Sequence, residues 1–279
     1  MPTFRHEGHR LAYTIYGDGP RTFVLVHGLL LSQKMHAPLA RALAERGHRV
    51  VTLDLLGHGR SARPRDMTLY SMSFFGEQMI GLLDHLGLDD AVLGGTSLGA
   101  NSALEAAAHA PERVRGMVIE MPVLDNALLA CAVAFTPLMV AFSFGEPVMR
   151  ALASAARRVP SGRGPLLADV ALDTIRQDPA PSAAVLHGLF FGRTAPHRNL
   201  RRRINAPALV IGHHRDPVHP FSDSGALAKE LPNARLVEAS SILELRLTPE
   251  RLTAEIGDFL DECWKPRRRG SASRGRKVA

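Results

Sequence analysis

The chain has 279 residues, 46% of them hydrophobic and 22% charged, which is typical of a soluble globular protein with one large domain or two small ones. Its two cysteines, Cys131 and Cys263, lie outside any CxxC or Cys/His cluster, which argues against a disulfide scaffold and a zinc site, and a reducing cytoplasm is the expected compartment. The net charge of +7 equals the seven Lys and Arg of residues 265–279, so residues 1–264 are near neutral and no specific nucleic-acid-binding face is expected.

Short apolar runs alternate with segments of helical periodicity along most of the chain. The first twenty residues predict an antiparallel hairpin at a sheet edge. In chain order, strands are then expected over residues 23–28, 49–54, 91–96, 114–121, 208–212 and 234–239, and helices over 35–47, 70–88, 98–111, 222–232 and 248–264. This alternation indicates an α/β fold in which helices cover both faces of a mostly parallel, twisted sheet.

Residues 122–206, between the sixth and seventh strands, are helix-like and strongly apolar, and we expect them to form a helical cap. The core then comprises residues 1–121 and 207–264. Residues 265–279 form a basic tail without apolar periodicity, which is expected to be disordered. Within the cap, residues 127–144 carry no charge. We favour a buried or pocket-lining segment there over membrane contact, and we expect no stable membrane span.

Residues 94–101 read GGTSLGAN, with Ser97 between Gly95 and Gly99 where a strand turns directly into a helix. Such a turn strains the backbone of its central residue, and small neighbours relieve the crowding, so that the hydroxyl stands clear at the end of the strand. The N–H groups of the first helical turn point to the same place and stabilise negative charge on a substrate oxygen. The pattern favours a nucleophilic serine over a serine that only caps the helix.

On these residues the chain resembles the α/β-hydrolase family, and the resemblance extends along the core. His27-Gly28 ends the third strand, DLLGHGRSARP (54–64) is similar to the family's loop after the next strand, and GHHRDPVHP (212–220) is similar to its strand-7 motif. The resemblance implies the α/β-hydrolase fold, with a cap inserted after the sixth strand.

The resemblance also implies roles for individual residues. The backbone N–H groups of Leu29 and Leu98 would form an oxyanion hole, and Asp216 would be the acid of a catalytic triad. His27, Gly28, Gly95 and Gly99 would shape the loops around the site. A serine at the elbow, in place of an aspartate, implies acyl transfer: cleavage of an ester, lactone, thioester, amide or carbon–carbon bond through an acyl-enzyme.

The family's catalytic histidine is missing from its usual place after the last strand. Counting back seven residues from Pro249, which with Glu250 opens the final helix, gives Ile242, and the stretch ASSILELRLTPE (239–250) contains no histidine. No histidine follows His219 in the chain. A serine hydroxyl needs a base whose pKa is close to the working pH and which lies within about 3 Å.

Three interpretations of this departure stay open. In the first, another histidine is the base; the candidates near the expected site are His213, His214 and His219, which flank Asp216, and His27 and His36, on or near the oxyanion loop. In the second, Ser97 and the oxyanion hole act on an activated substrate without a full triad. In the third, the site binds a ligand without hydrolysis. Since the elbow, the oxyanion glycine and Asp216 are all present, we favour an enzyme with an atypical triad.

Three carboxylates have alternative interpretations. Glu120 ends the sixth strand, where some members of this fold carry the acid, but a solvated strand end is favoured. Glu244 is a weak base for a hydroxyl at its ordinary pKa. Asp216 without a histidine would be a structural carboxylate that caps the helix beginning near Ser222.

The apolar cap indicates the substrate class. A lid of this composition dries the site and favours a small lipophilic substrate with an ester-like or activated carbonyl. The alternative is a non-hydrolytic member that binds an apolar ligand or guides a rearrangement or cyclisation. The sequence contains no phosphate-binding, dinucleotide-binding or metal-binding motif, so we expect no cofactor and no metal. A homodimer through the lid stays open, and Arg198 and Arg201–Arg203 are expected to form a solvated face in preference to a substrate anchor.

Overall fold

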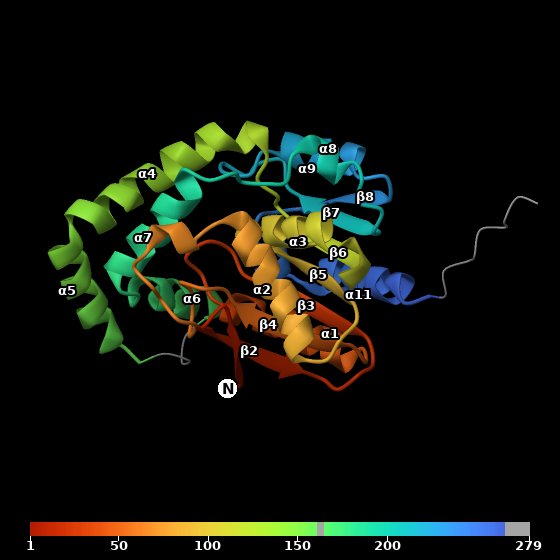
Figure 1. Cartoon of the computed structure of the whole chain (residues 1–279), viewed down its shortest axis with the longest axis horizontal. Coiled ribbons are helices and arrows are strands. Elements are labelled where there is room, and N and C mark those ends of the chain that lie inside the picture. Colours follow the sequence, from red (N-terminus) through yellow and green to blue (C-terminus); the bar gives the residue numbers. More distant parts are fainter. Residues whose placement is uncertain (161–164, 266–279) are drawn as a thin grey trace, which may run out of the picture.

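The computed structural model describes residues 1–160 and 165–265 (Figure 1). Its centre is an eight-stranded sheet in the order β1-β2-β4-β3-β5-β6-β7-β8. The strands are β1 (Thr3–His6), β2 (His9–Tyr16), β3 (Thr22–Val26), β4 (Arg49–Asp54), β5 (Ala91–Thr96), β6 (Val114–Glu120), β7 (Ala208–Gly212) and β8 (Ala234–Glu238). β2 pairs antiparallel with both β1 and β4, whereas β4, β3, β5, β6, β7 and β8 run parallel. The predicted fold class is confirmed, and the N-terminal hairpin lies at one sheet edge as expected.

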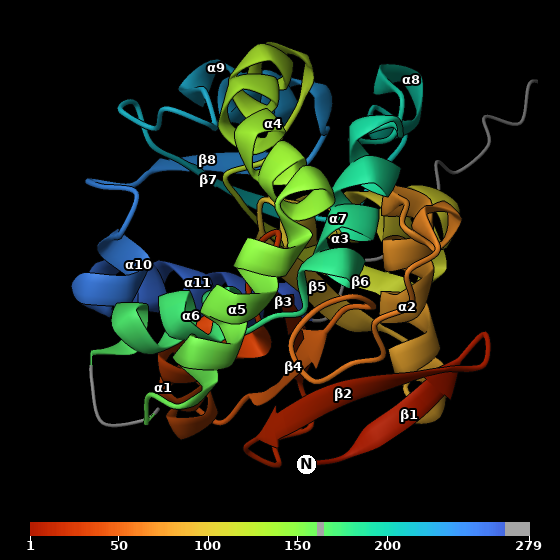
Figure 2. The same cartoon turned by 90° about the vertical axis from the view of Figure 1, so that its left-hand side faces the viewer.

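Helices cover both faces of the sheet (Figures 1 and 2). They are α1 (Ala37–Glu45), α2 (Met72–His85), α3 (Leu98–His109), α9 (Phe221–Glu230), α10 (Glu244–Leu247) and α11 (Glu250–Cys263). The inner parallel strands are buried on both faces, and β3 illustrates why. Val24 and Val26 belong to the cluster that contains residues of α2 and α3, and Phe23 and Leu25 belong to the cluster that contains residues of α1 and α11. Because successive side chains of a strand point to opposite faces, a continuous apolar run supplies both cores.

The helix predicted over residues 35–47 is helical in two separate parts. The periodic segment 35–47 divides into a 3₁₀ turn over Gln33–His36 and helix α1, which begins at Ala37 with Pro38 in its first turn. Proline has no N–H to donate and its φ suits the start of a helix, so it fixes the beginning of α1.

Residues 122–206 contain helices α4 (Leu128–Phe144), α5 (Glu146–Arg157), α6 (Leu166–Ile175), α7 (Pro179–Phe190) and α8 (Arg198–Arg201), and their described part contains no strand. In Figure 2, α4 and α5 are the outermost ribbons on the side facing the viewer. The division into core and cap is consistent with this order of elements. Of the predicted basic tail, only Lys265 lies within the described residues.

Two buried polar side chains of the core hold the cap where it leaves and rejoins the sheet. Asn101 donates to the carbonyl oxygens of Val123 (2.7 Å) and Thr194 (2.6 Å) and accepts from the Val123 N–H (3.1 Å). The Asp223 carboxylate accepts the N–H groups of Leu124 and Ala127, at the start of the cap. Both side chains are completely buried, so each satisfies backbone groups that water does not reach.

We therefore expect Asn101→Ala to lower the free energy of unfolding by about 3 kcal/mol, because it leaves several buried backbone groups without partners. Urea unfolding measures the effect. Asn205→Ala is the matched control, since that exposed side chain donates only to the nearby Arg203 carbonyl oxygen. Equal stability of the two variants would contradict the anchoring role of Asn101.

Candidate active site

Ser97 occupies a strained turn between β5 and α3. Its φ of 53° and ψ of −106° lie outside the usual regions for a non-glycine residue. Its N–H donates to the Glu120 carbonyl oxygen of the neighbouring strand at 2.9 Å, which helps to hold the turn. The Ser97 side chain makes no capping hydrogen bond to α3, so the alternative of a helix-capping serine is wrong.

The two glycines of the elbow allow a close approach of backbone segments. A Cβ added at Gly95 or at Gly99 would meet the carbonyl oxygen of Val26, at the end of β3. Any larger residue would push α3 away from the carboxyl end of β3 and from the loop that follows it. The glycines thus bring the first turn of α3 against that loop.

His219 contacts the Ser97 hydroxyl. The His219 Nε2 lies 2.9 Å from Ser97 Oγ, and its Nδ1 lies 2.9 Å from Asp216 Oδ2. Both His219 and Asp216 follow β7, three residues apart on one loop, whereas the family's usual histidine follows the last strand. The His219 side chain is 17% exposed and that of Asp216 is 5% exposed. A continuous hydrogen-bonded chain of three side chains therefore ends at the elbow hydroxyl.

Asp216 fixes both the position and the tautomer of His219. Its Oδ1 accepts the backbone N–H groups of Val218 (2.8 Å) and His219 (2.9 Å), which folds the loop back on itself. Burial raises the pKa of Asp216, but the hydrogen bonds and charge of His219 outweigh it, so the pKa lies below its ordinary value. A carboxylate only accepts, so Nδ1 of His219 carries the proton and Nε2 is left to accept from Ser97. Asp216 does not cap α9, whose N-terminus has no side-chain cap.

The other two histidines of this loop point elsewhere. His213 is bound on both ring nitrogens, by the Ser240 carbonyl oxygen at 3.2 Å and the Arg215 N–H at 3.1 Å. His214 is largely exposed, lies 3.4 Å from a Glu238 oxygen and stacks on Phe221. Neither contacts Ser97, so their candidacy as the base is wrong.

The histidines near the third strand are structural. His27 is fully buried, with Nδ1 bound to the Gly28 carbonyl oxygen at 2.8 Å and Nε2 accepting the Leu55 N–H at 3.1 Å. His36 binds the Val26 carbonyl oxygen at 3.0 Å. Burial lowers the pKa of His27 and holds that of His36 well below its ordinary value. Both rings shape the oxyanion loop as neutral groups, and neither is the base.

Glu120 and Glu244 each pair with an arginine. Glu120 and Arg246 form a buried ion pair (2.5 Å), and Arg246 also donates to the Thr96 hydroxyl at 2.7 Å. The expectation of a solvated Glu120 is therefore wrong. For Glu244, burial raises the pKa, but hydrogen bonds from Arg251 and Ser240 lower it to about 2. Both carboxylates are bound by an arginine, and neither contacts the Ser97 hydroxyl.

The segment that replaces the usual histidine loop supplies Arg246 instead. Ile242, at the position expected for histidine, is 38% exposed. Sequence reasoning did not single out Arg246, and its only signal was that it is the one cation in residues 239–250. Its guanidinium donates to Thr96, the residue before Ser97, and to Glu120, whose carbonyl oxygen accepts the Ser97 N–H.

An apolar cavity of about 370 Å³ opens at Ser97, large enough for a small ligand. Its lining residues come from the core and the cap: Leu29, Met72, Ser97, Leu98, Val123, Leu128, Cys131, Ala132, Phe135, Leu186, Leu189, Phe190, Gly192 and Thr194. Burial, aided by Asp223 and Asp216, raises the pKa of the Cys131 thiol to about 11, so this wall stays neutral. The cavity suits a lipophilic ligand.

Leu29 and Leu98, the expected oxyanion-hole residues, both line this cavity. Leu98 is the first residue of α3, whose first N–H groups have no partner within the helix. Next to Leu29, Leu30 has a positive φ of 58°, and its carbonyl oxygen accepts from Gln177 (2.9 Å) and Thr174 (3.1 Å) of the cap. The cap therefore holds this strained loop in place.

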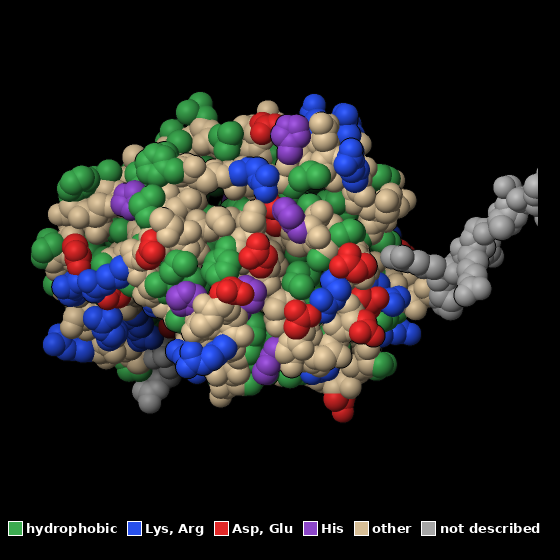
Figure 3. Space-filling model, in the orientation of Figure 1, with side chains coloured by type: hydrophobic (Ala, Val, Ile, Leu, Met, Phe, Trp, Pro, Cys, Tyr) green, Lys and Arg blue, Asp and Glu red, His purple; other side chains and the backbone are tan. Residues whose placement is uncertain are grey.

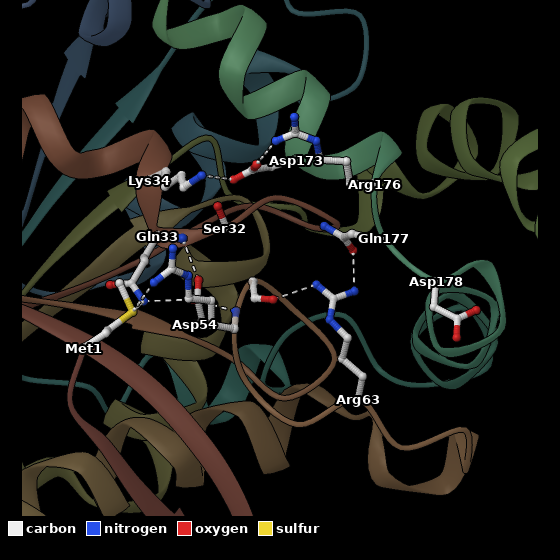
Figure 4. Close-up of a pocket in the computed structure, with 12 residues that line it drawn as sticks. Met1, Ser32, Gln33, Lys34, Asp54, Arg63, Asp173, Arg176, Gln177 and Asp178 are labelled. Carbon is white, nitrogen blue, oxygen red and sulfur yellow. Dashed lines mark hydrogen bonds and ion pairs between the residues drawn. The ribbon is translucent and has the colours of Figure 1, made fainter. Parts of the chain in front are cut away.

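A second cavity, of about 390 Å³, lies between the fourth strand's exit loop and α6 (Figure 4). Its walls are charged, and Arg63 points toward Gln177 there, bonding its side-chain oxygen at 3.1 Å. Lys34 and Arg176 both contact Asp173. Ser97 is not among its lining residues, so the apolar cavity is the one associated with the elbow.

The arginine cluster at the end of the cap divides between two environments. Arg201 is buried and pairs with Glu230 at 2.6 Å, and Arg198 contacts the same carboxylate at 2.6 Å. Arg202 and Arg203 are exposed. The expected solvated face is correct for the latter two and wrong for Arg201, which ties the end of the cap to α9.

Comparison with known proteins agrees with the fold. A family model described as the alpha/beta hydrolase fold matches residues 21–241. The chain belongs to this family. Over 93% of its length it superposes on all of the enol-lactonase from Burkholderia xenovorans LB400, with a TM-score of 0.74 and 25% identity.

Among curated α/β-hydrolase relatives, the chain is similar to an epoxide hydrolase of Caballeronia sordidicola (34% identity over 110 residues) and to the sn-1-specific diacylglycerol lipase ABHD11 of Mus musculus (36% over 113). Each match covers 39% of this chain, and they cover 33% and 36% of the respective relatives. The matches thus span about a third of either relative.

Proposed function

We propose that this chain is a serine hydrolase that cleaves a small lipophilic ester or lactone through an acyl-enzyme. The observation that carries the proposal is the hydrogen-bonded series Ser97–His219–Asp216, with 2.9 Å at each side-chain contact. A serine nucleophile at the elbow favours acyl transfer over the epoxide opening named for one relative. The enol-lactonase and the diacylglycerol lipase among its relatives support an ester-type substrate.

The chemistry follows from the tautomer of His219. As Ser97 Oγ attacks the substrate carbonyl carbon, its proton passes to His219 Nε2, and the Asp216 carboxylate stabilises the resulting imidazolium. The carbonyl oxygen becomes an oxyanion beside the N–H groups of Leu29 and Leu98. When the carbon–oxygen bond breaks, Nε2 returns the proton to the leaving alkoxide. Water then repeats the sequence on the acyl-enzyme and frees the acid and Ser97.

The cavity supports the choice of a lipophilic substrate. Its walls are Leu, Met, Phe, Val and a neutral Cys131, and no charged side chain lines it. A charged substrate would lose its hydration there without compensation, whereas an apolar acyl or alcohol group gains free energy on burial.

Labelling with a fluorophosphonate tests the proposal. We expect intact-mass analysis to find one adduct per chain, and none on Ser97→Ala, because only an activated elbow hydroxyl attacks phosphorus. Ser102→Ala is the matched control: its hydroxyl donates to the Leu98 carbonyl oxygen inside α3, so its adduct should persist. An unlabelled wild-type chain beside a labelled standard hydrolase would favour the non-hydrolytic alternative, a ligand-binding or rearrangement protein.

A further inference from the structure

The outer side of α4 is a continuous apolar stripe without a partner among the described residues. Leu129, Val133, Val140 and Phe144 recur on one side of the helix, and Leu129 is 77% and Phe144 86% exposed. Within Asp125–Phe144, the most apolar window of 18 residues has a mean hydropathy of 2.1, yet only 11% of that window is buried. A core helix of this composition would be covered, so α4 presents to solvent a surface that water disfavours.

α5 continues this surface and adds positive charge. Val148 is 65% and Leu152 is 52% exposed, one turn apart on the helix. Arg150 and Arg157 are exposed on the same helix; Arg150 pairs with Glu146 one turn earlier, and Arg157 donates to the Arg176 carbonyl oxygen. In Figure 3, hydrophobic side chains follow the upper left edge of the molecule over α4, and basic side chains gather below them at the left. A basic amphipathic helix of this kind is typical of a membrane surface.

The positive charge of the described part of the chain is concentrated in the cap. Residues 122–206 contain ten arginines and five acidic residues, a net charge of +5. Residues 1–121 and 207–265 contain 18 basic and 22 acidic residues, a net charge of −4. Three of the cap arginines pair with Glu105 and Glu230 of the core, and three others, Arg150, Arg157 and Arg158, lie on α5 or at its end. The cap therefore complements an anionic surface.

We propose that the outer cap face, defined by Leu129, Val133, Val140, Phe144, Val148 and Leu152, docks on an anionic lipid bilayer. The helix lies in the headgroup boundary and does not cross it, because Asp223 fixes its start and its inner side lines the Ser97 cavity. A second copy on the same face would bring two caps of net charge +5 together, which opposes that occupant. Arginines beside the face bind lipid phosphates and anionic headgroups.

Docking in this orientation places the cavity mouth at the lipid. Leu128 and Phe190 line the Ser97 cavity and are also 46% and 43% exposed, so the cavity meets the solvent next to the outer cap face. A lipophilic molecule dissolved in the bilayer would reach the cavity without entering water. This inference goes beyond the proposed hydrolysis, because it concerns where the protein lies and holds whatever reaction follows.

Vesicle co-sedimentation of the full chain tests the proposal. We expect the chain to bind vesicles of phosphatidylcholine mixed with phosphatidylserine, more weakly vesicles of phosphatidylcholine alone, and less at high salt. The double variant Leu129→Ser/Phe144→Ser should lower the partition coefficient at least about tenfold, since two large side chains no longer enter the lipid. Leu247→Ser is the matched control, a 61% exposed leucine on α10 of the core.

Every outcome bears on the proposal. No sedimentation overturns it, and so does equal sedimentation of the double variant, which would assign the binding to the basic residues 265–279. A stable dimer in light scattering that the double variant dissociates would assign the face to a second copy and also overturn it. Neither Leu129 nor Phe144 lines the cavity, so the double variant should hydrolyse a soluble ester as fast as the unchanged chain. A loss of this hydrolysis would bear on the proposed function and not on lipid docking.

Discussion

Replacing His219 by alanine is expected to lower kcat/KM for a soluble p-nitrophenyl ester by roughly 10⁴-fold, because nothing else at the elbow accepts the Ser97 proton. The free energy of unfolding should fall by only about 1 kcal/mol, since the ring is partly exposed and Asp216 keeps its backbone partners. Steady-state kinetics and urea unfolding of the same preparation separate the two effects.

The matched control for this variant is His214→Ala, five residues earlier on the loop. That ring contacts Glu238 and Phe221 and does not reach Ser97, so its activity should stay near that of the unchanged chain. A folded His219→Ala protein with nearly full activity would contradict the role of His219 as the base. It would favour the interpretation in which Ser97 and the oxyanion hole act alone.

The second large effect is expected for Asp216→Asn, which should lower kcat by about 10³-fold or more. An asparagine oxygen still accepts the N–H groups of Val218 and His219, so the loop keeps its shape. Its amide, however, donates toward Nδ1 of His219, which moves the ring proton to Nε2. Nε2 then donates to Ser97 and no longer accepts its proton.

A double variant distinguishes a shared role from two separate ones. If Asp216 acts through His219, Asp216→Asn combined with His219→Ala should be no slower than His219→Ala alone. Asp125→Asn, an exposed carboxylate at the start of the cap, is the control for the change of charge and should leave kcat unchanged. Additive losses in the double variant would show that Asp216 does not work through the histidine.

The proximity of acid and base in the chain has a structural consequence. Asp216 and His219 lie on one loop, and the acid binds both the ring and the backbone N–H of the base. Ile242 and the short helix α10 occupy the usual histidine position. Arg246 of α10 forms an ion pair with the Glu120 carboxylate. A buried charge pair thus braces the region where other family members place the histidine loop.

The sequence by itself determined the sheet, the elbow and the helical character of the segment between β6 and β7. Those features rest on local patterns: an apolar run is buried as a strand, the periodic segments pack as helices, and Gly-x-Ser-x-Gly between them permits one backbone conformation. The sequence also determined that a histidine base, if present, lies at or before residue 219.

Only the tertiary structure decided which histidine reaches Ser97. His213, His214 and His219 lie within seven residues, and composition does not reveal which way a loop turns its side chains. The decision comes from Asp216, whose carboxylate folds DPVH into a tight turn, and from the sheet, which brings β7 to the elbow. An acid followed three residues later by histidine, across a proline, was the signal in the sequence.

The exposure of α4 was likewise a tertiary outcome. Residues 127–144 are apolar on every side, so the pattern did not indicate which side would be covered. One side of the helix packs on α7 and the cavity, and no described residue covers the other. Burial depends on what the rest of the chain brings into contact, and a local sequence of uniform hydrophobicity carries no information about that.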